Sequence, residues 1–84
     1  MLPFDVDRVR IEPSKHFRIT RMRKWNWDVQ DIRGALQSAT RVVRRGKTKM
    51  EVWTRSEGSK KLVLAYYAEE NMVFVITATE GGRT

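Results

Sequence analysis

The chain contains no cysteine among its 84 residues. That absence excludes a disulfide framework, a cysteine-ligated zinc site and a catalytic thiol. No apolar run approaches the roughly 18 residues that a membrane-spanning helix requires, so we expect no membrane association. The first residues lack a basic segment followed by an apolar stretch, which argues against a secretory signal. Residues 1–84 are therefore predicted to form a single soluble domain located in the cytoplasm.

Groups that bind metals or phosphates are also scarce. The five glycines are scattered, so the chain has no glycine-rich loop that could cradle a phosphate. The carboxylates are dispersed and there is a single histidine, so no cluster predicts a metal site. We therefore expect neither a metal ion nor an organic cofactor.

Positive charge is abundant and unevenly distributed. The net charge is +7, yet residues 13–49 hold eleven basic and only two acidic residues, while the two flanking segments are each slightly acidic. A local cationic field of this kind indicates a polyanionic partner, which can be a nucleic acid, an acidic protein or an anionic membrane surface. Of these, RNA or another nucleic acid and an acidic protein are the partners that we expect. The alternative is a charged surface that only keeps the protein soluble.

The hydrophobic pattern predicts a strand followed by two helices. Val9 and Ile11 alternate with charged residues, which is typical of a short half-exposed strand over residues 8–12. Ser14 can cap a basic amphipathic helix of about ten residues that begins at Lys15. Asp28 can cap a second helix that ends near residues 37–38.

After the second helix the apolar period changes from about 3.6 to 2, which is the period of strands. Strands are predicted at 48–55, 62–67 and 72–79, with turns at 56–59 and 68–71. The nearly continuous apolar run in the middle strand is typical of a strand covered on both faces. The predicted fold is α+β, with two N-terminal helices packed on a three- to four-stranded antiparallel sheet in the order βααβββ. An exposed edge strand would allow two copies to pair as a homodimer.

Ten of the eleven basic residues between 13 and 49 fall into two clusters that we predict to bind nucleic acid. Arginine forks pair with phosphate oxygens, and lysine supplies a point charge. The first cluster lies on the predicted basic helix and consists of Lys15, Arg18, Arg21, Arg23 and Lys24. The second surrounds Gly46 in a flexible arm or a twisted ribbon and consists of Arg41, Arg44, Arg45, Lys47 and Lys49.

Aromatic side chains beside cations can stack on unpaired bases. Trp53 lies on the polar side of its predicted strand, so it either packs on a second layer or forms an exposed platform for a base. Trp27 is expected in the core. Tyr66 and Tyr67 are adjacent on a strand, so one of them must leave the core face.

His16 is the only histidine and a candidate acid or base for cleavage at a ribose 2′-hydroxyl. Nearby arginines, Arg21 among them, could stabilise the charge that develops on the phosphate, and Tyr67 could orient the substrate. This catalytic hypothesis requires the two basic clusters to converge beside His16. The alternatives are a structural histidine in a non-catalytic nucleic-acid-binding module, or a basic protein-interaction domain.

Residues 14–79 resemble a family of small bacterial and archaeal domains of unknown function. The family pattern opens with His-Ala, has Arg-Met in the same helix, and continues after a short turn with a helix bearing an acidic residue, an aliphatic residue and Ala-Leu. The residues that match are His16, Arg21, Met22, Asp31, Ile32, Ala35 and Leu36, with Val75, Ile76 and Thr77 in the last strand. Phe17 replaces a small residue of the pattern, and Trp25 replaces a second arginine.

That family is similar to the RelE-type and BrnT-type toxins of toxin–antitoxin pairs, which are compact α+β ribonucleases that cleave mRNA without a metal. The resemblance implies a RelE-like fold, an RNA-cleaving or RNA-binding role, and a cognate acidic antitoxin as partner. His16 and Arg21 are the polar family positions that it carries over to this chain.

Overall fold

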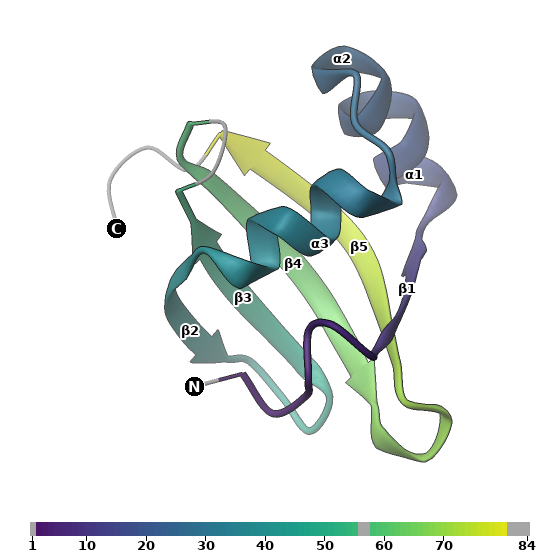
Figure 1. The fold of residues 1–84 in the computed structure, drawn as a ribbon, viewed down its shortest axis with the longest axis vertical. Coiled ribbons are helices and arrows are strands. Elements are labelled where there is room, and N and C mark those ends of the chain that lie inside the picture. Colours follow the sequence, from purple (N-terminus) through teal and green to yellow (C-terminus); the bar gives the residue numbers. More distant parts are fainter. Residues whose placement is uncertain (1, 56–57, 81–84) are drawn as a thin grey trace.

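Five strands form one mixed sheet in the computed structural model, which describes residues 2–55 and 58–80. Their bounds are β1 (Arg10–Pro13), β2 (Ala39–Arg44), β3 (Lys49–Thr54), β4 (Lys60–Tyr67) and β5 (Met72–Glu80). The spatial order is β1-β5-β4-β3-β2. Strands β2 to β5 pair antiparallel with their neighbours, whereas β1 runs parallel to β5 at one edge (Figure 1).

The segment before the second helix is one continuous helix with a π-helical turn in its middle. It consists of α1 (Lys15–Phe17), η1 (Arg18–Met22) and α2 (Arg23–Trp25), and is called the basic helix below. The Ser14 hydroxyl caps its start by accepting a hydrogen bond from the Phe17 amide at 3.0 Å. Asn26 ends it in the left-handed conformation with φ of 57°, which asparagine tolerates better than most residues.

The second helix, α3 (Val29–Gln37), crosses one face of the sheet (Figure 1). A capping box fixes its start: the Asp28 carboxylate accepts from the Asp31 amide at 3.0 Å, and the Asp31 carboxylate accepts from the Asp28 amide at 2.8 Å. Both the predicted cap and the predicted end of this helix are confirmed. A short 3₁₀ turn, η2 (Ala68–Glu70), joins β4 to β5.

The core lies between α3, the basic helix and the covered face of the sheet. Alternate strand residues supply its floor, and the fully buried ones include Val52, Leu62, Leu64, Val73 and Val75. Phe17 and Ile32 pack on this floor from the helices, and neither is exposed at all. Each such side chain contributes about 1.5–3 kcal/mol when it is fully removed from water.

The α+β class and the two helices on the sheet are confirmed, but the predicted sheet is wrong in two respects. It has five strands, because residues 39–44, predicted as an arm or ribbon, form β2. Their arginines and valines do not alternate cleanly, so the pattern hides a strand. The sheet is also mixed, because β1 pairs parallel with β5. The pattern of an edge strand contains no information on the direction of its neighbour.

Two further expectations concern the ends of elements and the membrane. The predicted turn at 56–59 lies partly outside the described residues, since the structure describes only its second half. In residues 2–55 and 58–80, no helix has both the length and the apolar character that crossing a bilayer requires.

Candidate nucleic-acid interface

The second face of the sheet carries no helix within the described residues, and it is called the open face below (Figure 1). Its side chains alternate with those of the core. They include Arg41 and Val43 on β2, Glu51 and Trp53 on β3, Lys61 and Val63 on β4, and Phe74 and Thr77 on β5. The prediction that residues 62–67 are covered on both faces is therefore wrong, although Val63 is half-buried by its neighbours.

Trp53 lies between two cations on this open face. The register places Arg41 of β2 and Lys61 of β4 directly opposite Trp53, one on each side. The Arg41 guanidinium carbon is 5.1 Å from the centroid of the indole, and the Lys61 ammonium nitrogen is 5.8 Å from it. Cation–π contacts at such partly exposed sites stabilise by about 0.5–1 kcal/mol each. The outcome is a half-buried aromatic ring with positive charge on both flanks.

Glu51 is the acidic residue at the centre of this face. Its carboxylate forms an ion pair with Arg45 at 3.1 Å and a longer one with Lys61 at 3.8 Å. Cations outnumber it on the open face and the β2–β3 turn, where they are Arg41, Arg45, Lys47, Lys49 and Lys61; Arg44, opposite the buried Met50, lies on the other side of β2. The surface that combines the β2–β3 hairpin with the open face therefore keeps a strong positive charge.

Tyr67 lies at the end of β4, beside the tip of the same hairpin. Its side chain leaves the core face and is 39% exposed, whereas Tyr66 packs on Phe4 with ring centroids 5.0 Å apart. The prediction that the two tyrosines face opposite ways is confirmed. Arg44 and Lys47 line a hollow together with Tyr67.

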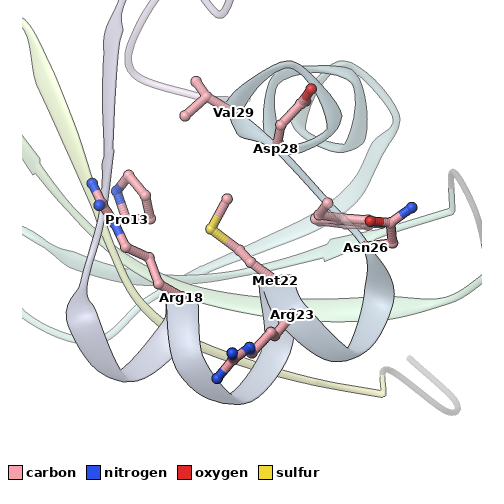
Figure 2. Close-up of a pocket in the computed structure, with 8 residues that line it drawn as sticks. Pro13, Arg18, Met22, Arg23, Asn26, Asp28 and Val29 are labelled. Atoms are coloured by element: carbon pink, nitrogen blue, oxygen red, sulfur yellow. The ribbon is translucent and has the colours of Figure 1, made fainter.

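The cations of the basic helix lie elsewhere on the molecule. Lys15, Arg18, Arg23 and Lys24 are all exposed, as the amphipathic pattern predicts. Arg18 and Arg23 lie beside a hollow of about 510 Å³ between this helix and the start of α3. Figure 2 shows the Met22 thioether pointing into that space toward Val29.

His16 and Arg21, the two positions carried over from the resemblance, have different environments. The His16 side chain is exposed, and its backbone carbonyl accepts a hydrogen bond from the Thr20 hydroxyl at 2.7 Å. Arg21 is half-buried, one helical turn from both Phe17 and Trp25, and its Nε atom is buried without a hydrogen-bond partner in the described part of the chain. The guanidinium of Arg21 is thus partly withdrawn from solvent.

The structure does not bring the two basic clusters together beside His16. The Lys60 ammonium at the start of β4 is 4.9 Å from the Trp25 ring, which fixes the end of the basic helix there. Tyr67 is the last residue of the same strand, so at ~3.3 Å per residue it lies about 23 Å away. Figure 1 shows the basic helix and the β2–β3 turn at opposite ends of the molecule. The convergence required by the catalytic hypothesis is absent.

Trp25 and Trp27 belong to the hydrophobic side of the molecule. Trp27 is 8% exposed, which confirms its predicted place in the core, and its ring contacts that of Trp25 at 4.9 Å. Among the tryptophans, Trp53 is therefore the one that offers an indole on a surface free of helices. An exposed platform for a base was one of the two alternatives predicted for Trp53.

Lys61 and Glu51 were not predicted from the sequence to belong to a binding surface. Glu51 belongs to the predicted strand 48–55, whereas Lys61 lies just before the predicted strand 62–67. A shift of one residue in the pairing moves every side chain to the other face, so these approximate bounds did not specify the neighbours of Trp53. Arg41 was predicted to bind nucleic acid from its charge, but its place beside Trp53 could not be inferred because its strand was not predicted.

No family model, curated protein or solved structure matches the chain. The resemblance to RelE-type toxins therefore stays a prediction. Within the described residues, no group of three or more histidine, aspartate or glutamate side chains is arranged to hold a metal ion.

Proposed function

We propose that this protein binds single-stranded RNA on the open face and the β2–β3 hairpin. The observation that carries the proposal is Trp53, held between Arg41 and Lys61 on the open face. Proteins that bind single strands combine a positively charged track for the phosphates with aromatic rings on which bases stack. Both components are present here on adjacent strands.

The dimensions of the open face suit a short single strand. Lys61, the second residue of β4, and Tyr67, its last, lie about 20 Å apart at ~3.3 Å per residue. Trp53 lies beside the first of these residues, and Phe74 lies between the two ends on β5. A strand of about four nucleotides would pass over these aromatic rings while its phosphates contact the hairpin cations.

A direct test is fluorescence anisotropy with a labelled 12-nucleotide RNA in EDTA, measured over a range of salt concentrations. If about five phosphates are neutralised, the logarithm of affinity falls with the logarithm of salt with a slope near −3.5 for a single strand. A slope near zero, or no binding at low salt, would contradict the proposal.

The matched control compares two variants that each lose three charges. One removes cations of the proposed surface, Arg41→Ala, Lys49→Ala and Lys61→Ala, and the other removes Lys15→Ala, Arg18→Ala and Lys24→Ala from the basic helix. We expect the first variant to lose most of the affinity and most of the salt slope. Equal losses in both variants would indicate attraction by net charge alone.

A metal-independent endoribonuclease that uses the cations of the basic helix alone is the second candidate function, because the second cluster and Tyr67 lie at the other end of the molecule. It is favoured by the exposed imidazole of His16, which lies on a helix with exposed Lys15 and Arg18. An imidazole can move a proton near pH 7, and the cations can stabilise charge on a phosphate. Cleavage of single-stranded RNA in EDTA that is lost in His16→Ala would support it, and intact RNA after prolonged incubation would argue against it.

The toxin–antitoxin hypothesis adds an acidic protein as partner. The basic helix supplies a suitable surface, because Ile19 is 51% exposed among its cations. An acidic protein that binds there should lose affinity for the basic-helix charge variant and keep its affinity for the open-face variant. Strands β1 and β2 are the two edges of the sheet, and either could pair with a second copy of the chain. The mass of the particle in analytical ultracentrifugation tests the predicted homodimer.

A further inference from the structure

A hollow of about 480 Å³ lies at the end of the sheet farthest from the basic helix, and it is called the tyrosine hollow below. The β2–β3 turn, the η2 turn and the N-terminal segment bound it. Its lining includes Pro3, Arg44, Lys47, Tyr67, Glu69 and Glu70. It adjoins the hairpin whose cations we propose to bind RNA, so a strand on that surface could end inside it.

Neighbouring contacts fix the walls of this hollow. Tyr66 packs on Phe4 on the core side, and its hydroxyl donates to the Asn71 side-chain oxygen at 3.4 Å. Asn71 ends the η2 turn with φ of 47°, a left-handed conformation that asparagine tolerates. The η2 turn therefore holds both glutamates beside the exposed ring of Tyr67.

The hollow combines opposite charges that do not neutralise one another. Arg44 and Lys47 line it from the hairpin, and Glu69 and Glu70 from the η2 turn. In residues 2–55 and 58–80, no ion pair joins either carboxylate to either cation. A ligand that matches both walls presents an anionic group to the hairpin cations and hydrogen-bond donors to the two carboxylates. A flat ring between these groups could stack on Tyr67.

A nucleotide has these three components. Its phosphate oxygens accept from arginine and lysine, its base stacks on an aromatic ring, and its N–H groups donate to a carboxylate. Guanine offers a carboxylate two adjacent donors, N1–H and the N2 amino group. Adenine and cytosine present a single amino group, and uracil presents only N3–H.

We infer that the tyrosine hollow binds one guanine nucleotide of a bound RNA. The phosphate contacts Arg44 and Lys47, the base stacks on Tyr67, and the carboxylate of Glu69 or Glu70 accepts the two donors of guanine. The inference rests on the proposed RNA binding and names the nucleotide that the end of the surface selects.

The experiment titrates the ¹⁵N-labelled full chain with guanosine, inosine and uridine 5′-monophosphates, and with inorganic phosphate. We expect saturable shifts of the amides of residues 66–71 with the guanine nucleotide. Inosine lacks the N2 amino group, so we expect its nucleotide to bind about tenfold more weakly than the guanosine nucleotide. The uridine nucleotide should bind more weakly than both. Equal binding of all three nucleotides, or shifts caused by inorganic phosphate alone, would overturn the inference.

Two variants identify the contacts. The double variant Glu69→Gln, Glu70→Gln removes both negative charges but keeps the shape of the side chains, and it should abolish the preference for guanine over inosine. Tyr67→Ala should lower the affinity for each of the three nucleotides by about tenfold. If the glutamine variant keeps the preference, the assignment of the carboxylates is wrong.

The Trp53→Ala variant separates this inference from the proposed function. It should lose affinity for the 12-nucleotide RNA while it binds the guanine nucleotide as the natural chain does. If the natural chain binds RNA but the guanine nucleotide leaves residues 66–71 unshifted, the inference fails and the proposed function stands. If the guanine nucleotide binds and RNA does not, the proposed function fails, and the inference falls with the RNA it depends on.

Discussion

The two faces of the sheet use the same strands for different purposes. On the covered face, Val52, Leu64 and Val75 are completely buried beneath the helices. On the open face, the intervening positions hold Trp53 and Glu51, half-buried among cations. Because side chains alternate along a strand, one element can supply the core with every second residue and a charged aromatic surface with the others.

This comparison shows where stability and binding reside. The covered face holds the apolar area on which folding depends, and substitutions there should unfold the protein before they alter its surface. The open face holds few groups that folding requires. Its cations and its indole are therefore free to serve a partner, and each prediction below tests that separation.

The largest effect is expected from a pair of neighbouring residues on β4 that face opposite ways. Leu64→Ala removes a fully buried side chain and should lower the free energy of unfolding by about 2–5 kcal/mol. Val63→Ala, on the open face, should cost about 1 kcal/mol or less because its side chain is only half-buried. Urea denaturation measures both values, and equal losses would show that a second layer covers the open face.

The second effect concerns binding. Trp53→Ala should lower the affinity for the 12-nucleotide RNA by about 5- to 150-fold, the range expected for one lost base stack at ~1–3 kcal/mol. Trp53→Phe keeps an aromatic face and should recover part of the affinity. Fluorescence anisotropy provides the measurement, and unchanged binding in Trp53→Ala would show that the bases do not stack there.

The third effect is a loss of stability at the start of α3, which lies on the covered face of the sheet. Asp28→Ala removes the side-chain acceptor that caps α3 and should lower the free energy of unfolding by about 0.5–2 kcal/mol. Asp28→Asn, which preserves capping ability, is the matched control and should cost less. Affinity for RNA should not change in either variant, and a parallel loss of affinity would place α3 in the interface.

The smallest effect is a gain in affinity. Glu51→Gln releases Arg45 and Lys61 from their ion pairs and removes a negative charge from the centre of the open face. Exposed ion pairs stabilise by about 0.2–1 kcal/mol, so the affinity for RNA should rise by no more than about fivefold. A decrease in affinity would mean that Glu51 positions the two cations for binding.

The elements with strong local signals were predictable from the sequence. The capping pair Asp28 and Asp31 identified α3, and strict alternation or an apolar run identified the last three strands. The missing strand, β2, lies at an edge where burial imposes little pattern on Thr40 and Arg41. The parallel pairing of β1 depends on tertiary packing that no local pattern specifies.

The candidate site was predictable by residue type but not by placement. Arg41, Arg44 and Trp53 were each identified as nucleic-acid-binding residues from charge and aromatic character. Their distance from His16 could not be inferred, because it depends on which edge of the sheet each segment occupies. Lys61 escaped notice because its role arises only from its register opposite Trp53.

The separation of the two faces can be tested in a single NMR titration with unlabelled 12-nucleotide RNA. The indole N–H groups of the three tryptophans lie on two sides of the molecule: those of Trp25 and Trp27 on the helical side, and that of Trp53 on the open face. We expect the Trp53 indole resonance to shift or broaden as RNA is added, while those of Trp25 and Trp27 stay in place. Movement of the Trp25 resonance with an unchanged Trp53 resonance would instead place the RNA on the helical side and contradict the proposal.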